Sequence, residues 1–262
     1  MPCPHNAEVI CEALHACLVE WHLEKKISTV TLDNCTSNDK AMQILPDKLD
    51  TKVLMLEGKY LHMRCAAHIL NLIVKDGLDV MEVGIERVRD SVAFWSATPK
   101  RHEKFEKMAR VMNTEYTCRL SLDCKTRWNS TYIMLTRALQ YKDVFSRLSI
   151  REKLFTCPTN EDWEFAKEVC ERLKVFFDIT ELLSGSKYVT ANIFFPKICG
   201  IRLAIRKWHS SDIDLIKAMS EEMKGKFEKY WKDVHGLMAI ATVLDPRFKL
   251  HMLQVSYTVF IC

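Results

Sequence analysis

The chain has 262 residues, of which 48% are hydrophobic and 27% are charged. These proportions are typical of a soluble globular protein, and the length is enough for one large or two modest domains. No stretch approaches the roughly 18 uninterrupted apolar residues of a membrane helix, and the first residues lack the pattern of a secretion signal. The 11 cysteines are scattered and odd in number, which favours reduced thiols inside the cell.

The net charge of +4 is small, and most Lys and Arg residues are interleaved with Glu and Asp. A dedicated nucleic-acid-binding domain usually has a clustered basic face instead. Two short basic stretches stand out, at residues 99–102 and 125–127. We interpret the first of them as a solvated helix face.

The chain begins with a helix, a strand and a second helix. Apolar residues recur at helical spacing over residues 6–24, and a β-branched run over residues 27–32 is typical of a strand buried on both faces. The strand ends on Asp33. Polar residues after it supply N-cap oxygens for a helix that runs to about Leu45, and Pro46 helps to end that helix.

The next part, residues 53–64, has two short apolar stretches around Gly58, which indicates a loop and a strand. From Cys65 onward the periodicity is helical, and Gly77 is positioned to close the first of these helices. Further helices are expected at residues 80–97, 100–113, 130–148, 158–183, 192–208, 212–234 and 237–244. The expected fold is therefore mainly helical: an α/β region at residues 1–64, an all-α region at residues 65–250, and a short tail.

Asp33 has two interpretations. A carboxylate at the end of a strand is a common ligand of the two Mg²⁺ ions that activate the attacking and leaving oxygens in polynucleotide transfer. A single carboxylate does not hold two ions, and Asp39 is predicted to lie on the following helix. On spacing alone, capping of that helix or simple solvation is favoured over metal binding.

Histidine and cysteine gather at the start of the all-α region, where His62, Cys65 and His68 lie close together in the sequence. With Cys118 and Cys124 they have the thiolate and imidazole donors of a structural zinc site. Their spacing is not that of a known zinc module, however. We favour a hydrogen-bonded pair, Cys65 and His68, that fixes the junction between the two regions, and we expect no bound zinc.

The stretch CKTRWNSTYIML, residues 124–135, places a cation and an indole before an apolar helix. Arg127 is suited to pairing with a phosphate, and Trp128 to stacking on an unpaired base, worth about 1–3 kcal/mol per base. Alternatively, Trp128 anchors the helix in the core while Arg127 forms a salt bridge at the rim. The residues alone favour the core.

Five stretches together resemble one family. They are TLDNCTSNDKAM, LHMRCAAHILNLIVKDGL, CKTRWNSTYIML, SGSKYVTANIFF and LMAIATVLDPRFKL. This order of motifs is similar to that of plant hAT-superfamily transposases, above all the domesticated RICESLEEPER- and DAYSLEEPER-like group. The resemblance extends to about Leu250, and His251–Cys262 do not continue it.

The resemblance implies an RNase H-like fold that is interrupted by a long helical insertion. It makes Asp33 the second acidic residue of the Asp-Asp-Glu triad that binds Mg²⁺ in the family, and Cys65 and His68 its Cys-x-x-His motif. It also makes Arg127 and Trp128 the Arg-Trp motif, whose Trp is implicated in holding a flipped base. The chain begins after the expected first Asp and the BED zinc finger, and it stops before the expected Glu.

We therefore expect a transposase-derived nuclear fragment, truncated at both ends, without strand-transfer or nuclease activity and without a cofactor. The expected partners are DNA, bound weakly, and related full-length hAT-like proteins, with no membrane partner. Two alternatives stay open. One is an interaction or structural module with a vestigial DNA surface, and the other is an incomplete gene model of a catalytic transposase.

Overall fold

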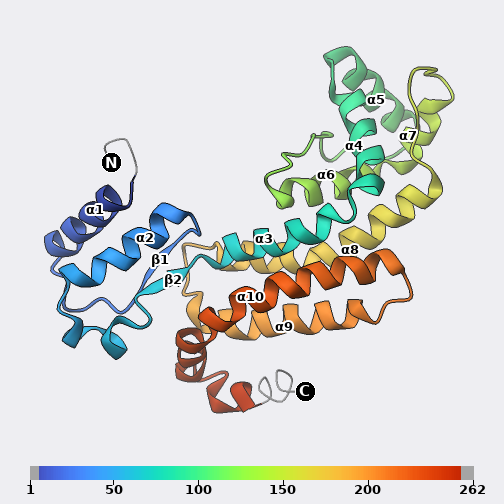
Figure 1. The fold of residues 1–262 in the computed structure, drawn as a ribbon. Coiled ribbons are helices and arrows are strands. Elements are labelled where there is room, and N and C mark those ends of the chain that lie inside the picture. The colour runs from blue at the N-terminus through green and yellow to red at the C-terminus, as the bar shows by residue number, and fades with distance from the viewer. Residues whose placement is uncertain (1–5, 255–262) are drawn as a thin grey trace. The chain divides into compact units, whose positions relative to one another are not determined.

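The structure is a computed structural model that describes residues 6–254. It is mainly helical (Figure 1) and divides into two compact units. Unit 1 contains the chain up to Leu70, residues Val189–Pro196 and the chain from Glu228 onward. Unit 2 contains Asn71–Tyr188 and Lys197–Phe227. None of the described helices has both the length and the apolar content that a membrane crossing requires.

The α-helices are α1 Ala7–Glu20, α2 Thr36–Ile44, α3 Ala66–Asp79, α4 Glu82–Ser96, α5 Pro99–Val111, α6 Trp128–Gln140, α7 Lys142–Ser149, α8 Asn160–Leu183, α9 Ala191–His209 and α10 Asp214–Leu244. The strands are β1 Val30–Leu32 and β2 His62–Arg64, and short 3₁₀ turns lie at Leu45–Lys48, Thr51–Val53 and Met55–Gly58.

Unit 1 contains a parallel pair of strands. β1 and β2 pair in register, with Val30 opposite His62 and Leu32 opposite Arg64. Parallel strands need a long crossover connection, and α2 with the 3₁₀ turns supplies it. The predicted strand is present but shorter than residues 27–32, and it is not buried on both faces, because the side chain of Thr31 is exposed.

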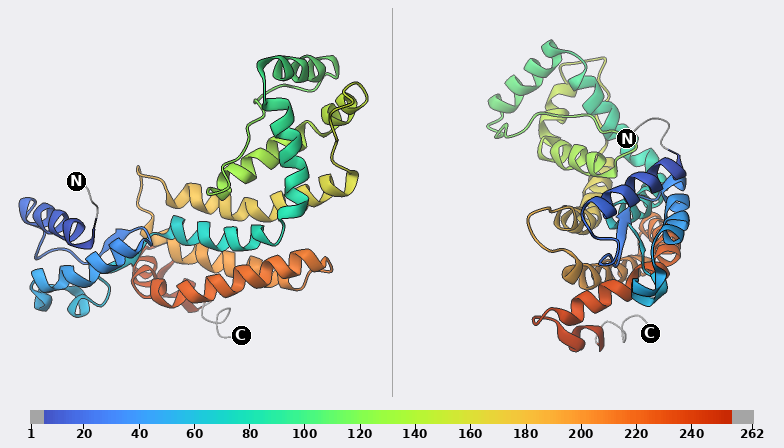
Figure 2. Two further views of the ribbon diagram at one scale, coloured as in Figure 1. Left: turned by 45° about the horizontal axis from the view of Figure 1, so that its top comes forward. Right: turned by 90° about the vertical axis from the view of Figure 1, so that its left-hand side faces the viewer.

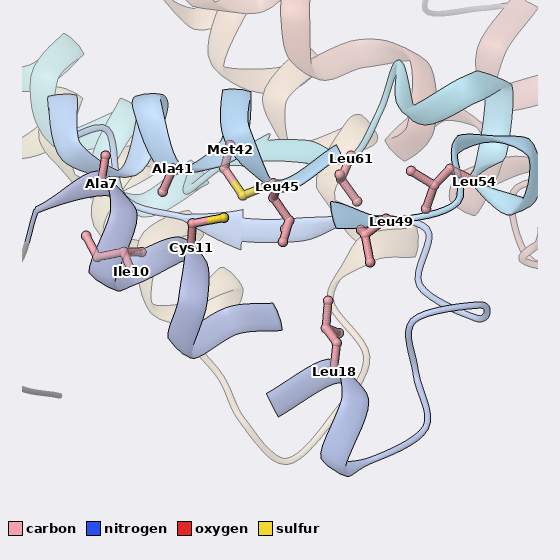
Figure 3. Packing of buried hydrophobic residues seen from close by; sticks show 10 residues of the cluster. All are labelled: Ala7, Ile10, Cys11, Leu18, Ala41, Met42, Leu45, Leu49, Leu54 and Leu61. Atoms are coloured by element: carbon pink, nitrogen blue, oxygen red, sulfur yellow. The ribbon is translucent and has the colours of Figure 1, made fainter. Parts of the chain in front are cut away.

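The core of unit 1 lies between α1, α2 and the chain that follows them (Figure 3). It consists of small and aliphatic side chains from these elements: Ala7, Ile10, Cys11, Leu18, Ala41, Met42, Leu45, Leu49, Leu54 and Leu61. Burial of apolar side chains contributes about 1.5–3 kcal/mol each for the larger ones. This cluster therefore holds α2, and with it the end of β1, in place.

The core of unit 2 is aromatic. α4 packs against α5, α6 and α8, and α5 packs against α7; these helices are coloured green to yellow in Figures 1 and 2. Trp95 of α4 lies 5.9 Å from the ring of Phe105 on α5, which in turn lies 4.9 Å from that of Phe145 on α7. Trp163 of α8 completes the set, 5.5 Å from Phe145.

Gly77 does not end a helix as predicted. Gly77 lies inside α3, which continues to Asp79; a Cβ at this position would meet the side chain of Met223 at 2.6 Å, so the glycine permits close packing. Gly236 lies inside α10, which is one helix and not the two predicted for this stretch. A Cβ there would lie 2.7 Å from the hydroxyl of Tyr60.

The helix predicted at residues 130–148 is instead two helices, α6 and α7, which meet at Tyr141. The buried hydroxyl of Tyr141 donates a hydrogen bond to the carbonyl oxygen of Cys118, 2.9 Å away, and its ring packs edge-on against Phe105. These contacts come from residues far apart in the sequence, so periodicity does not reveal the break.

The predicted boundaries after residues 64 and 250 stay predictions. The predicted tail begins with residues 251–254, which are helical, and its remainder, residues 255–262, lies outside the described residues. α10 ends at Leu244, directly before the turn at Asp245 and Pro246.

Candidate functional site

Asp33 follows β1 directly and lies at the start of α2. Its Oδ1 accepts hydrogen bonds from the backbone N–H of Cys35, at 3.2 Å, and from the side-chain amide of Asn38, at 2.7 Å. Hydrogen bonds from the thiol and the backbone N–H of Cys35 lower the pKa of Asp33, and Asn38 and the charge of His68 lower it further. Cys35 is the N-cap residue of α2, so Asp33 stabilises the first turn of that helix.

The neighbouring acid, Asp39, is committed to a different partner. Its carboxylate forms an ion pair with Arg64 of β2, at 3.1 Å, and its Oδ1 lies 3.9 Å from Nε2 of His62. Burial lowers the pKa of His62, and the charge of Arg64 lowers it further, although Asp39 opposes both. The carboxylate of Asp39 is therefore neutralised by a cation of this chain.

The Cys65 and His68 motif lies where β2 leads into α3. The backbone N–H of Cys65 donates to the carbonyl oxygen of Leu32, at 2.8 Å, which ties the end of β2 to the end of β1. The two side chains do not hydrogen bond to each other in the described structure. The junction is fixed by the backbone and not by the side-chain pair that the spacing suggested.

The described residues do not form a metal centre of the expected kind. Among the residues whose side chains the structure describes, which are 6–231 and 236–254, no group of three or more His, Cys, Asp or Glu side chains is arranged to hold a metal ion. Two Mg²⁺ ions need several fixed oxygen ligands, and Asp33 alone does not fit them. The candidate zinc ligands Cys118 and Cys124 contact protein groups instead, Gln140 and Thr126 respectively.

Arg127 and Trp128 lie at the start of α6 in unit 2. The side chain of Arg127 is exposed and makes no ion pair with any described residue, whereas Trp128 is only 3% exposed. The indole packs edge-on against Phe176 of α8, with ring centres 6.4 Å apart. Trp128 thus has the core position that the residues alone favoured, and its role in DNA binding stays a prediction.

The segment before α6 is held by a buried ion pair. Arg89 of α4 donates two hydrogen bonds to the carboxylate of Asp123, from Nε at 2.8 Å and from Nη2 at 2.9 Å, and Thr131 of α6 donates a third at 2.7 Å. The side chain of Asp123 is 1% exposed and that of Arg89 is 12% exposed. Burial raises the pKa of Asp123, but the bonds from Arg89 and Thr131 outweigh it, and the pKa is lowered.

Two further contacts fix the same segment. The Ser130 hydroxyl accepts from the N–H of Cys124, at 2.8 Å, and lies within hydrogen-bonding distance of the carbonyl oxygen of Arg127, at 2.6 Å. Lys125 pairs with Glu86 and Glu82 of α4, at 2.6 and 3.2 Å. We name residues 123–131 the Arg127 loop, and these contacts within the chain hold its conformation.

Comparison with known proteins identifies the family. Three family models match the chain in succession: a ZBED1 RNase-like domain at residues 1–60, a ZBED1 RNase-like helical domain at residues 63–172, and an hAT-like transposase domain of RNase-H fold at residues 192–261. The chain is a relative of the hAT transposases. The predicted family resemblance is thereby confirmed.

Several relatives of this hAT-like chain are plant proteins. It is 39% identical over 95% of its length to a putative AC transposase of Zea mays, covering 32% of that protein. It is 35% identical to the zinc finger BED domain-containing protein RICESLEEPER 2 of Oryza sativa and 28% identical to DAYSLEEPER of Arabidopsis thaliana, each over 97% of the chain, covering 36% and 37% of them. The chain thus spans about a third of the length of these relatives.

Arg89 and Asp123 shape the Arg127 loop of this hAT-like chain, but no pattern in the sequence marks them as functional. Arg89 lies on α4 among alternating acids and bases, a pattern that normally marks a solvated face. Asp123 lies in a polar, aperiodic stretch. Asp123 could have been noticed because it precedes the motif of Arg127 and Trp128. Its position does not indicate that its partner is Arg89, which lies 34 positions away in the sequence.

Proposed function

We propose that this chain is the DNA-handling segment of a nuclear, transposase-derived protein, and that it does not cleave or join DNA by itself. The observation that carries the proposal is the Arg127 loop. It holds the guanidinium of Arg127, exposed and without an ion pair to any described residue, at the start of α6. The neighbouring charges of Asp123 and Lys125 are already paired.

A phosphate group is the ligand that fits this loop best. The start of a helix carries unsatisfied backbone N–H groups and a partial positive charge, and Arg127, the N-cap residue of α6, provides no side-chain acceptor for them. A guanidinium beside such N–H groups pairs with phosphate in a bidentate geometry. Because the loop is preorganised, little ordering entropy opposes binding.

Trp128 packs beneath the Arg127 loop and supports the proposed contact between Arg127 and phosphate. Its indole is part of the core and forms one wall of a pocket of about 60 Å³ that Lys75 and Arg89 also line, room for a few water molecules. Stacking of Trp128 on a base requires the indole to leave Phe176, so we assign the primary phosphate contact to Arg127.

The non-catalytic part of the proposal is supported by the surroundings of Asp33. Its Oδ1 already accepts two hydrogen bonds, and the nearest acid along the chain, Asp39, is paired with Arg64. A two-ion reaction centre needs several carboxylates on the same ions. Asp33 by itself is expected to bind Mg²⁺ weakly and without productive geometry.

The DNA-binding part is tested by fluorescence anisotropy with a labelled duplex over a range of salt concentrations. Binding should strengthen as salt falls, and Arg127→Ala should weaken it. Arg119→Ala is the matched control, because Arg119 is an exposed arginine that precedes the loop. Equal effects of both variants, or no binding at low salt, would overturn the assignment.

The non-catalytic part is tested by incubating the purified chain with Mg²⁺ or Mn²⁺ and a hairpin or terminal-repeat substrate. We expect no cleavage. Cleavage that disappears in Asp33→Ala would contradict the proposal, as would a rise in the unfolding midpoint on adding Mg²⁺ that the same variant abolishes.

A second candidate function is that the chain is one part of a longer catalytic transposase. It is favoured by the 39% identity to a putative AC transposase of which the chain covers 32%. Sequencing the transcript across both ends distinguishes the two. A third, an interaction module, predicts that neither Arg127→Ala nor Trp128→Ala changes DNA affinity once the folded fraction is accounted for.

A further inference from the structure

A basic surface on unit 2 lies on different elements from the Arg127 loop. α5 buries Phe105, Met108 and Ala109 against the rest of the unit. Its exposed side includes Lys100, Lys104 and Lys107, which are spaced four and three residues apart and therefore share one face. Lys100 and Lys107 are about 10 Å apart along the helix axis, at roughly 1.5 Å per residue.

The turn between α7 and α8 adds cations to the same surface. α5 packs beside α7 (Figure 1), and Lys104 of α5 forms an ion pair with Glu152 of the turn, at 2.7 Å. The hydrogen bond and the charge of Lys104 lower the pKa of Glu152, and the charge of Arg101 also lowers it. Arg151 and Lys153, on either side of Glu152, are exposed.

An aromatic contact fixes how the two elements meet. The guanidinium of Arg101 lies 3.8 Å from the ring centre of Phe94 and donates a hydrogen bond to its carbonyl oxygen, at 3.2 Å. The ring of Phe94 lies 5.3 Å from that of Phe155, which follows the turn. Stacking of a guanidinium on an aromatic ring contributes about 0.5–1 kcal/mol at an exposed site.

The positive charge of this surface exceeds the negative charge that could neutralise it. α5 has two acids, of which Glu106 is bound by Arg110 and Glu103 forms no ion pair in the described structure. Lys100, Lys107, Arg151 and Lys153 likewise form no ion pair with any described residue. We name these four side chains the α5 basic surface.

We propose that the α5 basic surface binds the sugar–phosphate backbone of nucleic acid. The geometry favours this partner, because the cations lie on a rigid helix and a turn fixed against it, which suits the regularly spaced charges of a duplex. An anionic membrane is the less favoured partner. Interfacial binding is strongest where cations border a continuous apolar face, whereas the exposed apolar side chains near this surface are separate ones, Val111, Ile150 and Leu154.

This inference rests on the proposed DNA binding and adds a second contact surface to it. Two separate phosphate contacts on one rigid unit would act together, so that losing either lowers affinity and the steepness of the salt dependence. Because the α5 basic surface and the Arg127 loop are formed by different elements, their variants can be tested independently.

The test compares the full chain with two charge-matched triple variants in the same anisotropy assay. Lys100→Gln, Lys107→Gln and Lys153→Gln together remove three cations of the surface. The control combines Lys207→Gln, Lys217→Gln and Lys224→Gln, three exposed lysines of α9 and α10 in unit 2. Because all six side chains are exposed, both variants should retain the unfolding midpoint of the wild type.

We expect the surface variant to bind DNA about tenfold or more weakly than the wild type. The slope of log K against the logarithm of the salt concentration should also become shallower by about 2 to 3, since each lost phosphate contact accounts for roughly 0.9. The control should lose much less. A parallel experiment uses vesicles that contain phosphatidylserine, and we expect the wild type to bind them no better than the control variant does.

The outcomes separate the two proposals. If Arg127→Ala weakens binding and the surface variant does not, the α5 basic surface is overturned and the proposed function stands. If only the surface variant weakens binding, the α5 basic surface stands and the phosphate contact assigned to Arg127 is overturned. Equal losses in the surface and control variants, or a loss of vesicle binding with DNA binding unchanged, also overturn the surface assignment.

Discussion

Asp33 in unit 1 and Asp123 in unit 2 each lie shortly before a helix, but they are held by different kinds of contacts. The donors to Asp33 come from two and five positions further along the chain, and its side chain is exposed. The principal donor to Asp123 comes from 34 positions away, and its side chain is 1% exposed.

The difference in burial and in the distance of the donors along the chain indicates which of the two acids stabilises the fold. A carboxylate bonded by its immediate neighbours stabilises one helix turn and stays in contact with water, so a ligand can reach it. A buried carboxylate that joins two helices is committed to structure, because removing one member of a buried pair leaves an uncompensated charge. Of the four predictions below, the first sets the scale with a buried residue of the Arg127 loop, and the other three test this contrast between an accessible acid and a structural one.

The largest expected effect is that of Trp128→Ala, which removes the indole from the core beneath the Arg127 loop. We expect the free energy of unfolding to fall by about 4 kcal/mol, since large-to-small changes of a buried Trp typically cost about 3–5 kcal/mol. Urea unfolding followed by circular dichroism measures it. Trp21→Ala is the control, because Trp21 is 69% exposed, and its change should stay within about 0.5 kcal/mol.

Asp123→Ala should come next. It leaves the guanidinium of Arg89 buried without its principal partner, so we expect a loss of about 3 kcal/mol in the free energy of unfolding. Asp178→Ala breaks an exposed pair with Lys174 and should change stability by less than about 0.5 kcal/mol. Equal losses in the two variants would show that Asp123 is no more structural than a surface acid.

The pH dependence of stability should also show that Asp123 is a structural acid. The pKa of Asp123 is lowered in the folded state, so its contribution is fully present above its unfolded pKa, about 3.9. That contribution is lost as pH falls from there through the lower folded pKa. The thermal unfolding midpoint, measured from pH 6 downward, should therefore fall less steeply with pH in Asp123→Asn than in the wild type. A parallel decline would contradict the assignment.

The smallest effect is expected for Asp33→Ala. Exposed substitutions usually change stability by about 0.5 kcal/mol or less, and only the first turn of α2 depends on this carboxylate. Amide hydrogen exchange should nevertheless accelerate at Cys35, whose N–H donates to Asp33. A loss of 2 kcal/mol or more would mean that Asp33 is as structural as Asp123, and the contrast would fail.

Local signals in the sequence predicted part of this fold. α8 begins as expected, because Thr159 and Asp162 form a capping box within one turn, and α1 lies within the helical periodicity of residues 6–24. Asp33 was found because strand composition and the next helix start bracket it. In each case the determining residues are neighbours in the chain.

Contacts across the chain determined the remainder. Gly77 was predicted to end a helix but allows close approach of Met223, and Tyr141 divides two helices through a bond to Cys118. Arg89 reads as a surface charge until its bond to Asp123 is known. A single sequence has no record of such pairs, so neither the loop's support nor the α5 basic surface was predictable.

The chain segments that make up each unit determine when that unit can finish folding during synthesis. Unit 1 combines the first seventy residues with residues 189–196 and with the chain from Glu228 onward, and unit 2 lies between these segments. On a ribosome, the α1 and α2 layer emerges more than 150 residues before the segment from Glu228 that completes unit 1. Synthesis adds about 5–20 residues per second, so nascent unit 1 keeps part of its packing surface uncovered for many seconds, and a chaperone would find its binding site there.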